Sequence, residues 1–349
     1  SIANQTWPHI DCIIVDPQSP DDTAAVAQQL ADSYPDRKLR LLKHRNRGLS
    51  ASRNAGIQNT TAPLILPLDA DDLLKPEAVE RMVRPFLDDE GLSVVHSAGR
   101  EFGDGHQPMP AQEITKEIQL HKNQIACCSM FTRCAWQRVG GYNENMLHGY
   151  EDWDFWVGML EHGLRFHAVP DELWLYRKHG RSMIDDAQEK DIWLRSRIIL
   201  NHPDLYHPEH VALATEVLDL GNEEPDLQLR VRIARFYTEV NCPEHGVPHC
   251  RILLGERGAD LDGAALACVS FMLGYGLLAL EQPTEATPHL QRAVDLEPSK
   301  AQYLRALALA MFWGGKPQEA LPWLERAIWL EPESQESQRL VKKMRQAVS

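Results

Sequence analysis

The stretch LILPLDADDLLKP, residues 64–76, places an apolar run directly before three acids, Asp69, Asp71 and Asp72. A short apolar run that ends in turn residues indicates a buried strand. Burying a charge is costly, so three carboxylates at the end of such a strand need a reason in chemistry or in local structure. The neighbouring segments indicate where in a fold this strand end lies.

Strand-like and helix-like segments alternate along the first 200 residues. Apolar runs predict strands, and Ala-rich or amphipathic runs predict helices. The expected strands are 9–16, 39–43 and 64–68, and the expected helices are 20–35, 48–60 and 75–89. This alternation predicts an α/β fold with a mostly parallel sheet and helices on both faces. Ligands of such sheets bind beyond the carboxyl ends of the strands, where Asp16 and Asp69 fall.

One residue separates Asp69 from Asp71, so their carboxylates can hold a hard divalent cation between them. Mg²⁺ and Mn²⁺ prefer oxygen ligands and often accept one or two carboxylates, leaving other positions for water and phosphate. The structural alternative is that Asp71 and Asp72 cap the helix expected from about Pro76. Capping does not account for Asp69.

A second acidic pair, Glu151 and Asp152, lies in GYEDWDFW at 149–156. The pair can serve a reaction, or it can supply first-turn acids that interact favourably with the helix dipole. The later segment YRKHGRSM, 176–183, contains His179 among basic residues. A solvated histidine is the plain alternative to a ligand at that position.

Six motifs in order carry a family resemblance: NQTWPHIDCIIVD, NRGLSASRNAGI, LILPLDADD, GGYNE, GYEDWDFW and YRKHGRSM. Over residues 1–185 the series closely resembles the family 2 inverting glycosyltransferases, which implies the Rossmann-like GT-A fold. The resemblance implies transfer of a sugar from a nucleotide sugar, a UDP-sugar before any other, to a saccharide, lipid or protein hydroxyl. It also implies Mn²⁺ or Mg²⁺ as cofactor.

The resemblance assigns donor and metal roles. Asp16 matches an acid on the uracil or ribose side of the donor, and Arg53 matches a donor-side basic residue, with a helix-surface arginine as the alternative. Asp71 matches the main metal ligand, and Asp69 matches a second one nearer the ribose or sugar. His179 matches a position that in some GT-A enzymes binds the metal or the diphosphate.

The resemblance also assigns the reacting groups. Asp152 matches the catalytic base and Glu151 its supporting neighbour, while 140–144 matches the segment that lines the sugar and acceptor pocket. A base is needed because a hydroxyl is a poor nucleophile until a carboxylate takes its proton. The family implies a single inverting displacement, and loops such as 99–126 are expected to select the sugar and the acceptor.

Two departures from the family pattern concern the N-terminal part. Family members usually read VDDGS where this chain reads VDPQS, 15–19, so Pro17 and Gln18 replace an acid and a glycine. One donor contact is therefore expected to be lost or rebuilt. The family's first strand would precede Ser1, so we expect roughly 25–30 further residues upstream, the length of a strand and helix.

Composition restricts the partners. The chain of 349 residues has a net charge of −14, which argues against a nucleic-acid partner because such proteins gather Lys and Arg. No apolar run reaches the roughly 18–20 residues of a transmembrane helix. Seven cysteines without a C-x-x-C pair indicate buried reduced thiols. We therefore expect a cytoplasmic protein, with a peripheral position at the inner face of the membrane as an alternative.

The C-terminal part contains an internal repeat. Ala286, Leu290, Ala293 and Pro298 recur as Ala320, Leu324, Ala327 and Pro332, and each pair is 34 residues apart (332 − 298 for the prolines). This is the tetratricopeptide (TPR) period. A degenerate earlier unit is expected over 226–262, and 334–349 reads as a polar capping helix.

The predicted organisation is a transferase domain over 1–200, a linker over 201–225 with solvated histidines, and TPR-like helices over 226–349. The helical module can bind a protein partner or acceptor, or it can associate with itself and steady the transferase. Two functions remain open: a metal-dependent transferase, or a transferase-like scaffold impaired in catalysis and kept for TPR-mediated assembly.

Overall fold

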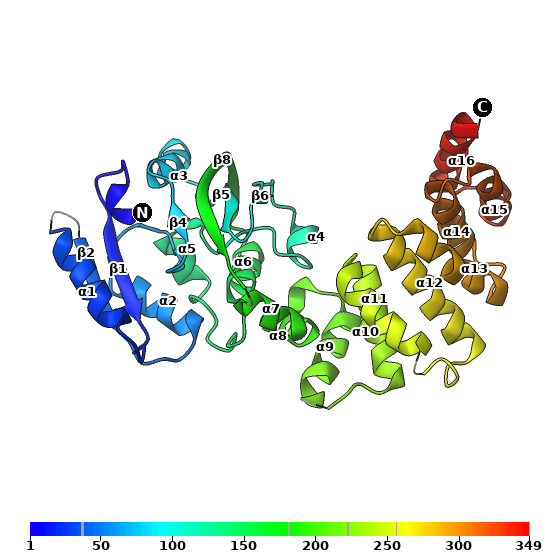
Figure 1. Ribbon diagram of the computed structural model, residues 1–349, viewed down its shortest axis with the longest axis horizontal. Helices are drawn as coiled ribbons and strands as arrows, with labels where there is room; N and C mark the ends of the chain where they lie inside the picture. The colour runs from blue at the N-terminus through cyan, green and yellow to red at the C-terminus, as the bar shows by residue number, and fades with distance from the viewer. Residues whose placement is uncertain (36–37, 181, 222, 256, 349) are drawn as a thin grey trace. The chain divides into compact units, whose positions relative to one another are not determined.

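The chain folds into two compact units, Ser1–Ala214 and Thr215–Ser349. The computed structural model describes residues 1–35, 38–180, 182–221, 223–255 and 257–348. Strands and helices mix in the first unit, and the described residues of the second unit form helices without strands (Figure 1). The predicted fold class, an α/β domain followed by a helical repeat domain, is confirmed.

The N-terminal unit contains short and long strands in two sheets. The strands are β1 (Asp11–Asp16), β2 (Lys38–Lys43), β3 (Leu64–Ile65), β4 (Leu73–Leu74), β5 (Leu92–Gly103), β6 (Pro108–Met109), β7 (Met130–Thr132) and β8 (Arg165–Lys178). β1 and β2 form a parallel pair, and the six-stranded sheet has the order β3-β7-β5-β8-β4, with β6 on β5. In the larger sheet only β5 and β8 run parallel, so it is mixed rather than mostly parallel.

The helices of the first unit lie between these strands in sequence. They are α1 (Thr23–Ser33), α2 (Leu49–Gln58), α3 (Ala78–Asp88), α4 (Lys116–Gln119), α5 (Arg133–Arg138), α6 (Glu151–Glu161), α7 (Met183–Glu189), α8 (Asp191–Asn201) and α9 (Pro208–Leu220), with 3-10 turns Ile2–Asn4 and Pro203–Leu205. Thus α9 occupies much of the segment expected to be a linker.

The central strand β5 is buried on both faces. Val95 belongs to a core cluster with Met82 of α3, and Val94 belongs to one with Phe131 and with Trp156 of α6. Successive side chains of a strand point to opposite faces, so neighbouring valines serve two different helical layers. This packing fixes α6, whose first turn carries Glu151 and Asp152, against the sheet.

The predicted strand 64–68 is shorter than expected. β3 ends at Ile65, where it pairs with β7. Pro67 follows two residues later, and proline has no N–H to donate to a sheet ladder. The segment from Leu66 to Asp72 is therefore a loop that contains the three acids and leads from β3 to β4.

The C-terminal unit is a series of helix pairs. These are α10 (Leu227–Glu239) with α11 (Pro243–Gly255), α12 (Gly263–Ala279) with α13 (Pro283–Leu296), α14 (Ala301–Trp313) with α15 (Pro317–Leu330), and then α16 (Gln335–Val348). The six repeated alanines and leucines of α13 and α15 are fully buried in the core of this unit. The 34-residue spacing therefore marks the faces that pack between neighbouring helices.

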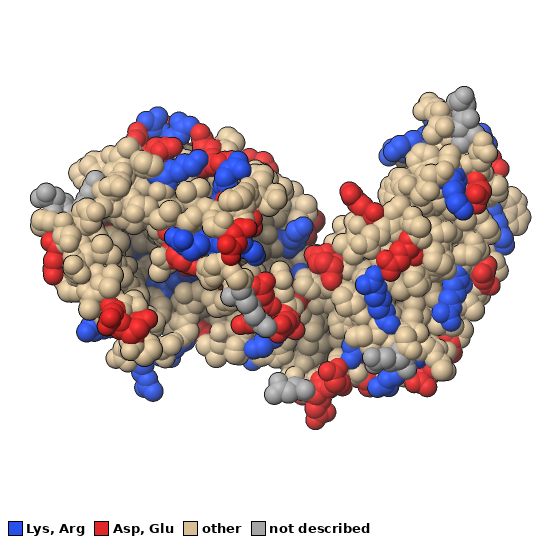
Figure 2. Space-filling model, viewed as in Figure 1, with Lys and Arg blue, Asp and Glu red and all other residues tan. Residues whose placement is uncertain are grey.

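The charges, the helices and the cysteines can be compared with what the composition indicated. On the face drawn in Figure 2, acidic and basic side chains alternate over the described residues of both units. Within the described part of the chain, no helix combines the length and apolar character that a membrane crossing requires. All seven cysteines are free thiols.

The glycine at position 274 tests the helical packing. A Cβ on Gly274 would lie 2.5 Å from Cγ of Leu290 and 3.1 Å from the carbonyl oxygen of Ala286. We expect Gly274→Ala to lower the free energy of unfolding by about 1–3 kcal/mol, as overpacking does. Urea unfolding followed by circular dichroism measures the change.

Gly263→Ala, on the same helix, is the matched control. A Cβ at Gly263 meets no atom within 4 Å, so this change should be neutral or stabilise by about 1 kcal/mol at most. Equal stability of the two variants would contradict the close approach of α12 and α13.

Candidate active site

The three acids after β3 do not cap the next helix. Asp69 to Asp72 form a turn closed by the Asp72 N–H donating to the Asp69 carbonyl at 3.1 Å, and β4 follows. Helix α3 begins at Ala78, with Glu77 as its N-cap. The capping interpretation of Asp71 and Asp72 is therefore wrong.

Arg53 joins two of the predicted acidic motifs. It lies on α2, with 8% of its side chain exposed, so the surface-arginine alternative is wrong. Its Nη1 donates to Oε1 of Glu151, and its Nη2 lies 3.0 Å from Oδ1 of Asp69. The guanidinium also lies over the ring of Tyr142, 5.5 Å from the centroid. Residues far apart in the sequence thus meet at one buried cation.

Asp152 lies beside this ion pair but faces other partners. Its Oδ2 accepts a hydrogen bond from Nδ2 of Asn123 at 3.2 Å, and its Oδ1 accepts one from the Trp153 N–H at 2.8 Å. Burial raises the pKa of Asp152 and the charge of Glu151 raises it further, while Arg53 opposes both effects. A carboxyl group that titrates well above the usual range of aspartate is suited to accept a proton near neutral pH.

Asp71 and His179 form a second contact. His179 directly follows β8, and its Nε2 lies 3.3 Å from Oδ2 of Asp71, with about half of each side chain exposed. Asp72 turns inward instead, where its Oδ1 accepts the Arg177 N–H at 2.8 Å. Burial raises the pKa of Asp72 to about 6, and the charges of Asp69 and Asp71 add to that effect.

The predicted metal ligands are only partly brought together. Among the described residues, no three or more His, Cys, Asp and Glu side chains form a group that could hold a metal ion. Asp71 and His179 are in contact, whereas Asp69 is directed to Arg53. The Asp71–His179 contact thus brings together one carboxylate and one imidazole.

The segment GGYNE is held by the residue after Arg53. Asn54 of α2 accepts the Tyr142 N–H at 2.9 Å and donates to the Tyr142 carbonyl at 2.8 Å. Gly141 has φ 88°, and a Cβ there would lie 2.9 Å from Oδ1 of Asn54, so the close approach requires glycine. These contacts fix the Tyr142 ring, stacked on Phe155 at 4.1 Å, beneath Arg53.

A family model confirms the resemblance that the motifs suggested. Residues 1–147 match the model described as "Glycosyl transferase family 2". This part of the chain is a family 2 glycosyltransferase domain. Arg53, Asp69 and Asp71 lie within the matched residues, whereas Glu151, Asp152 and His179 follow them.

Curated relatives are similar over the same region. Chondroitin synthase of Escherichia coli is 28% identical over 172 residues, which cover 47% of this chain and 24% of that protein. The uncharacterized glycosyltransferase YibD of E. coli K12 is 32% identical over 118 residues, covering 33% of each chain. Among solved structures, S. aureus TarS with UDP-GlcNAc has a TM-score of 0.48 at 14% identity, covering 90% of this chain and 86% of that one. This chain spans about a quarter or less of the curated synthases that it resembles.

Asp16 lies apart from these contacts in the glycosyltransferase domain. It ends β1 in the two-stranded sheet and accepts the Ser19 N–H at 3.0 Å. This hydrogen bond, with that of the Ser19 hydroxyl, lowers the pKa of Asp16. Pro17 and Gln18 lie between these two residues, with Gln18 at φ 63°. The segment that departs from the family pattern therefore holds the Asp16 carboxylate through Ser19.

Two residues of the site were not predicted as part of it. Asn123 contacts Asp152, and the Cys127 Sγ lies 3.4 Å from Oδ2 of Asp69. Burial and the charge of Asp69 raise the pKa of Cys127, so its thiol stays protonated and can donate. Asn123 lies in the segment 99–126, which was expected to select the sugar and the acceptor but without a motif for any one residue. The adjacent cysteines 127 and 128 indicated burial alone.

The buried Arg53–Glu151 pair tests how strongly the site is tied to the fold. Removing one partner of a buried ion pair typically costs about 3–5 kcal/mol, because the other charge stays buried. We therefore expect Arg53→Met to lower the free energy of unfolding by that amount in urea titrations followed by tryptophan fluorescence.

Arg81→Met is the matched control in the same unit. Arg81 pairs with Asp171, and 44% and 39% of these side chains are exposed, so solvent screens the pair and its loss should shift the unfolding transition little. If Arg53→Met were as mild as this control, Arg53 would not hold the site together.

Proposed function

We propose that the chain is a metal-dependent inverting glycosyltransferase that transfers a sugar from a UDP-sugar to a hydroxyl acceptor. The observation that carries the proposal is Asp152, a carboxylate with a raised pKa beside the ion pair of Arg53 and Glu151. Family 2 membership of residues 1–147 supplies the reaction class.

In the proposed reaction Asp152 is the base. The acceptor hydroxyl loses its proton to a carboxylate oxygen of Asp152 while its oxygen bonds to the anomeric carbon of the donor. The bond from that carbon to the diphosphate breaks at the same time, and the nucleotide leaves with the electron pair. Attack opposite the leaving group inverts the anomeric centre, and no protein nucleophile is needed.

Arg53 is proposed as a positioning residue as well as a donor-side cation. Both of its Nη atoms are engaged by carboxylates, Glu151 and Asp69. A planar guanidinium sets the direction of its partners because its donors have a fixed geometry. Arg53 thereby keeps Asp69 toward the donor side and leaves Asp152 for the acceptor.

Asp71 and His179 would hold the divalent cation, with Asp69 near the donor. A site with only one carboxylate and one imidazole leaves positions for diphosphate oxygens, and its mixed donors favour Mn²⁺ over Mg²⁺. When bound, the cation neutralises the charge of the leaving diphosphate.

The acceptor is proposed to be a saccharide hydroxyl before a lipid or protein hydroxyl. The names of the first curated relatives, chondroitin and hyaluronan synthases, describe makers of saccharide polymers. We further propose a cytoplasmic location, free or peripheral at the membrane, and a TPR-like module that binds a protein partner or acceptor or associates with itself.

A scaffold with impaired catalysis is the second candidate. The small number of metal-binding side chains favours this candidate. Asp69 is directed to Arg53, and the described residues offer no group of three ligands. The two functions differ in donor binding, which a scaffold does not require.

Donor binding is measured by calorimetry with UDP, with and without Mn²⁺. We expect Mn²⁺ to strengthen UDP binding about tenfold, which corresponds to 1.4 kcal/mol. Asp71→Ala should remove this effect of Mn²⁺. Asp88→Ala, an exposed aspartate at the end of α3, should bind like the unaltered chain. A folded chain that binds no UDP with Mn²⁺ would favour the scaffold.

The base is tested by the pH dependence of turnover. UDP release from UDP-sugars should rise with pH and level off above an apparent pKa higher than the ~4 of an ordinary aspartate. This follows because only the deprotonated Asp152 accepts a proton and its pKa is raised. Asp152→Asn should lower kcat by about 10²–10⁴-fold while UDP binding is kept. Unchanged turnover in Asp152→Asn would assign the base elsewhere.

A further inference from the structure

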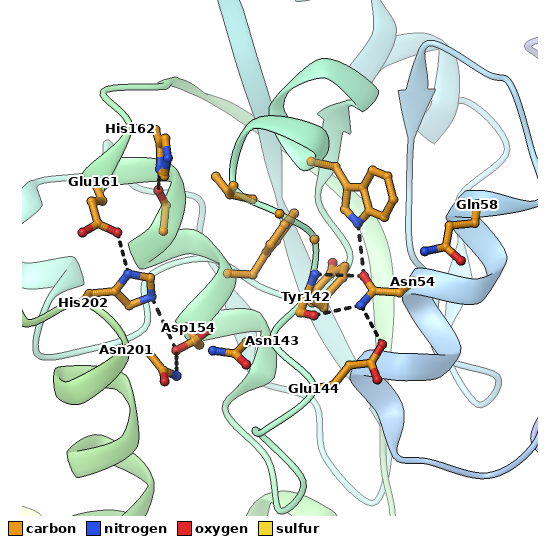
Figure 3. A pocket seen from close by; sticks show the side chains of 16 residues that line it. Asn54, Gln58, Tyr142, Asn143, Glu144, Asp154, Glu161, His162, Asn201 and His202 are labelled. Atoms are coloured by element: carbon orange, nitrogen blue, oxygen red, sulfur yellow. Dashed lines mark hydrogen bonds and ion pairs between the residues drawn. The ribbon is translucent and has the colours of Figure 1, made fainter.

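A cavity lies in the N-terminal unit, beside the residues proposed for the reaction but lined by others. Its volume is about 530 Å³, within the range of small-molecule sites. It is bounded by α2, the segment 139–144, α6 and the end of α8 (Figure 3). Its lining includes none of Arg53, Asp69, Asp71, Asp152 and His179.

One side of the cavity is a hydrogen-bonded group of α6 and α8. Nδ1 of His202 lies 2.7 Å from Oε2 of Glu161, and its Nε2 lies 3.5 Å from Oδ1 of Asp154. Asn201 donates a hydrogen bond to the same oxygen of Asp154 at 2.6 Å. His202 is 9% exposed, so the expectation of a solvated histidine in the linker is wrong for this residue. These contacts give the cavity a fixed polar side.

The opposite side carries polar groups around an aromatic ring. Figure 3 shows Asn54 and Gln58 of α2 across from the His202 group, with Asn143 and Glu144 between them. Trp136 also lines the cavity, and its Nε1 donates to Oδ1 of Asn54 at 3.2 Å, which fixes the plane of the indole. A flat aromatic face packs against the C–H face of a sugar ring, while amides and carboxylates bind its hydroxyls.

The charge of the lining narrows the ligand class. The lining contains three carboxylates, Glu144, Asp154 and Glu161, and two histidines. Arg47, which pairs with Glu144, is largely exposed to solvent. An anionic ligand would be repelled by this lining, whereas hydroxyls and an ammonium group would find acceptors. The polar residues therefore fit a neutral or amino sugar better than a uronate or a phosphate.

We propose that this cavity is a saccharide-binding site for a neutral or amino monosaccharide unit, distinct from the reaction site. The segment 140–144, which the family resemblance assigns to the sugar and acceptor pocket, lies between the two: its Tyr142 ring packs beneath Arg53 on the reaction side, and its backbone and Glu144 line the cavity on the other. A sugar in the cavity would thus contact the segment that positions Tyr142. The proposal does not rest on the transferase function.

The test is saturation-transfer NMR on the full chain with glucose, glucosamine and glucuronate as probes. Glucose and glucosamine should bind in the presence of saturating UDP and Mn²⁺, and they should bind Asp71→Ala equally well. Glucuronate should bind more weakly than either. Gln58→Leu should weaken glucose binding about three- to tenfold, the loss of one hydrogen bond.

Gln29→Leu, an exposed glutamine on α1, is the matched control and should leave binding unchanged. The proposal is overturned if none of the probes binds, if UDP displaces them, or if glucuronate binds most tightly. It is also overturned if Gln58→Leu and Gln29→Leu behave alike. UDP binding is recorded separately on the same samples, so failure of the donor site and failure of the cavity are distinguished.

Discussion

A buried guanidinium on α2 holds the candidate active site together. Arg53 pairs with Glu151 at the start of α6 and with Asp69 in the loop after β3. In a buried environment of low dielectric constant such pairs are strong, and an unpaired member is costly. The loop and the helix are therefore constrained to meet at α2, and the other contacts of the site follow from that meeting.

The neighbouring residue on α2 extends this constraint to another segment. Asn54 satisfies both the N–H and the carbonyl of Tyr142 and also accepts from Trp136. Consecutive residues of a helix project about 100° apart, so Arg53 faces the acids while Asn54 faces the segment 140–144. One short helix thus positions the acids on one side and the border of the cavity on the other.

Local features of the fold could be predicted from the sequence, and long-range ones could not. The helix–strand alternation and the 34-residue spacing are periodic, so burial of Ala286 and Leu290 could be predicted directly. The mixed sheet could not, because strand direction depends on pairing between distant segments such as β5 and β7. Likewise the short length of β3 follows from Pro67 only when its partner strand is known.

The candidate site shows the same division. Its acids and Arg53 lie in recognisable motifs, whereas Asn123 and Cys127 belong to a segment without one and enter through contacts with Asp152 and Asp69. The cavity beside the site depends on His202, whose partners lie 41 and 48 residues earlier in the chain (202 − 161 and 202 − 154). Contacts of this kind leave no pattern in the sequence around any one residue.

Glu151 and Asp152 show how a helix start can divide the work of two adjacent carboxylates. Successive side chains of a helix do not face each other, so Glu151 reaches Arg53 while Asp152 reaches Asn123. Glu151 pairs with the Arg53 guanidinium and serves as its structural partner. Asp152 keeps only hydrogen bonds, and burial, together with the negative charge of Glu151, raises its pKa. The charge of Arg53 lowers this pKa but does not cancel the rise, so Asp152 becomes the carboxylate able to take up a proton near neutral pH.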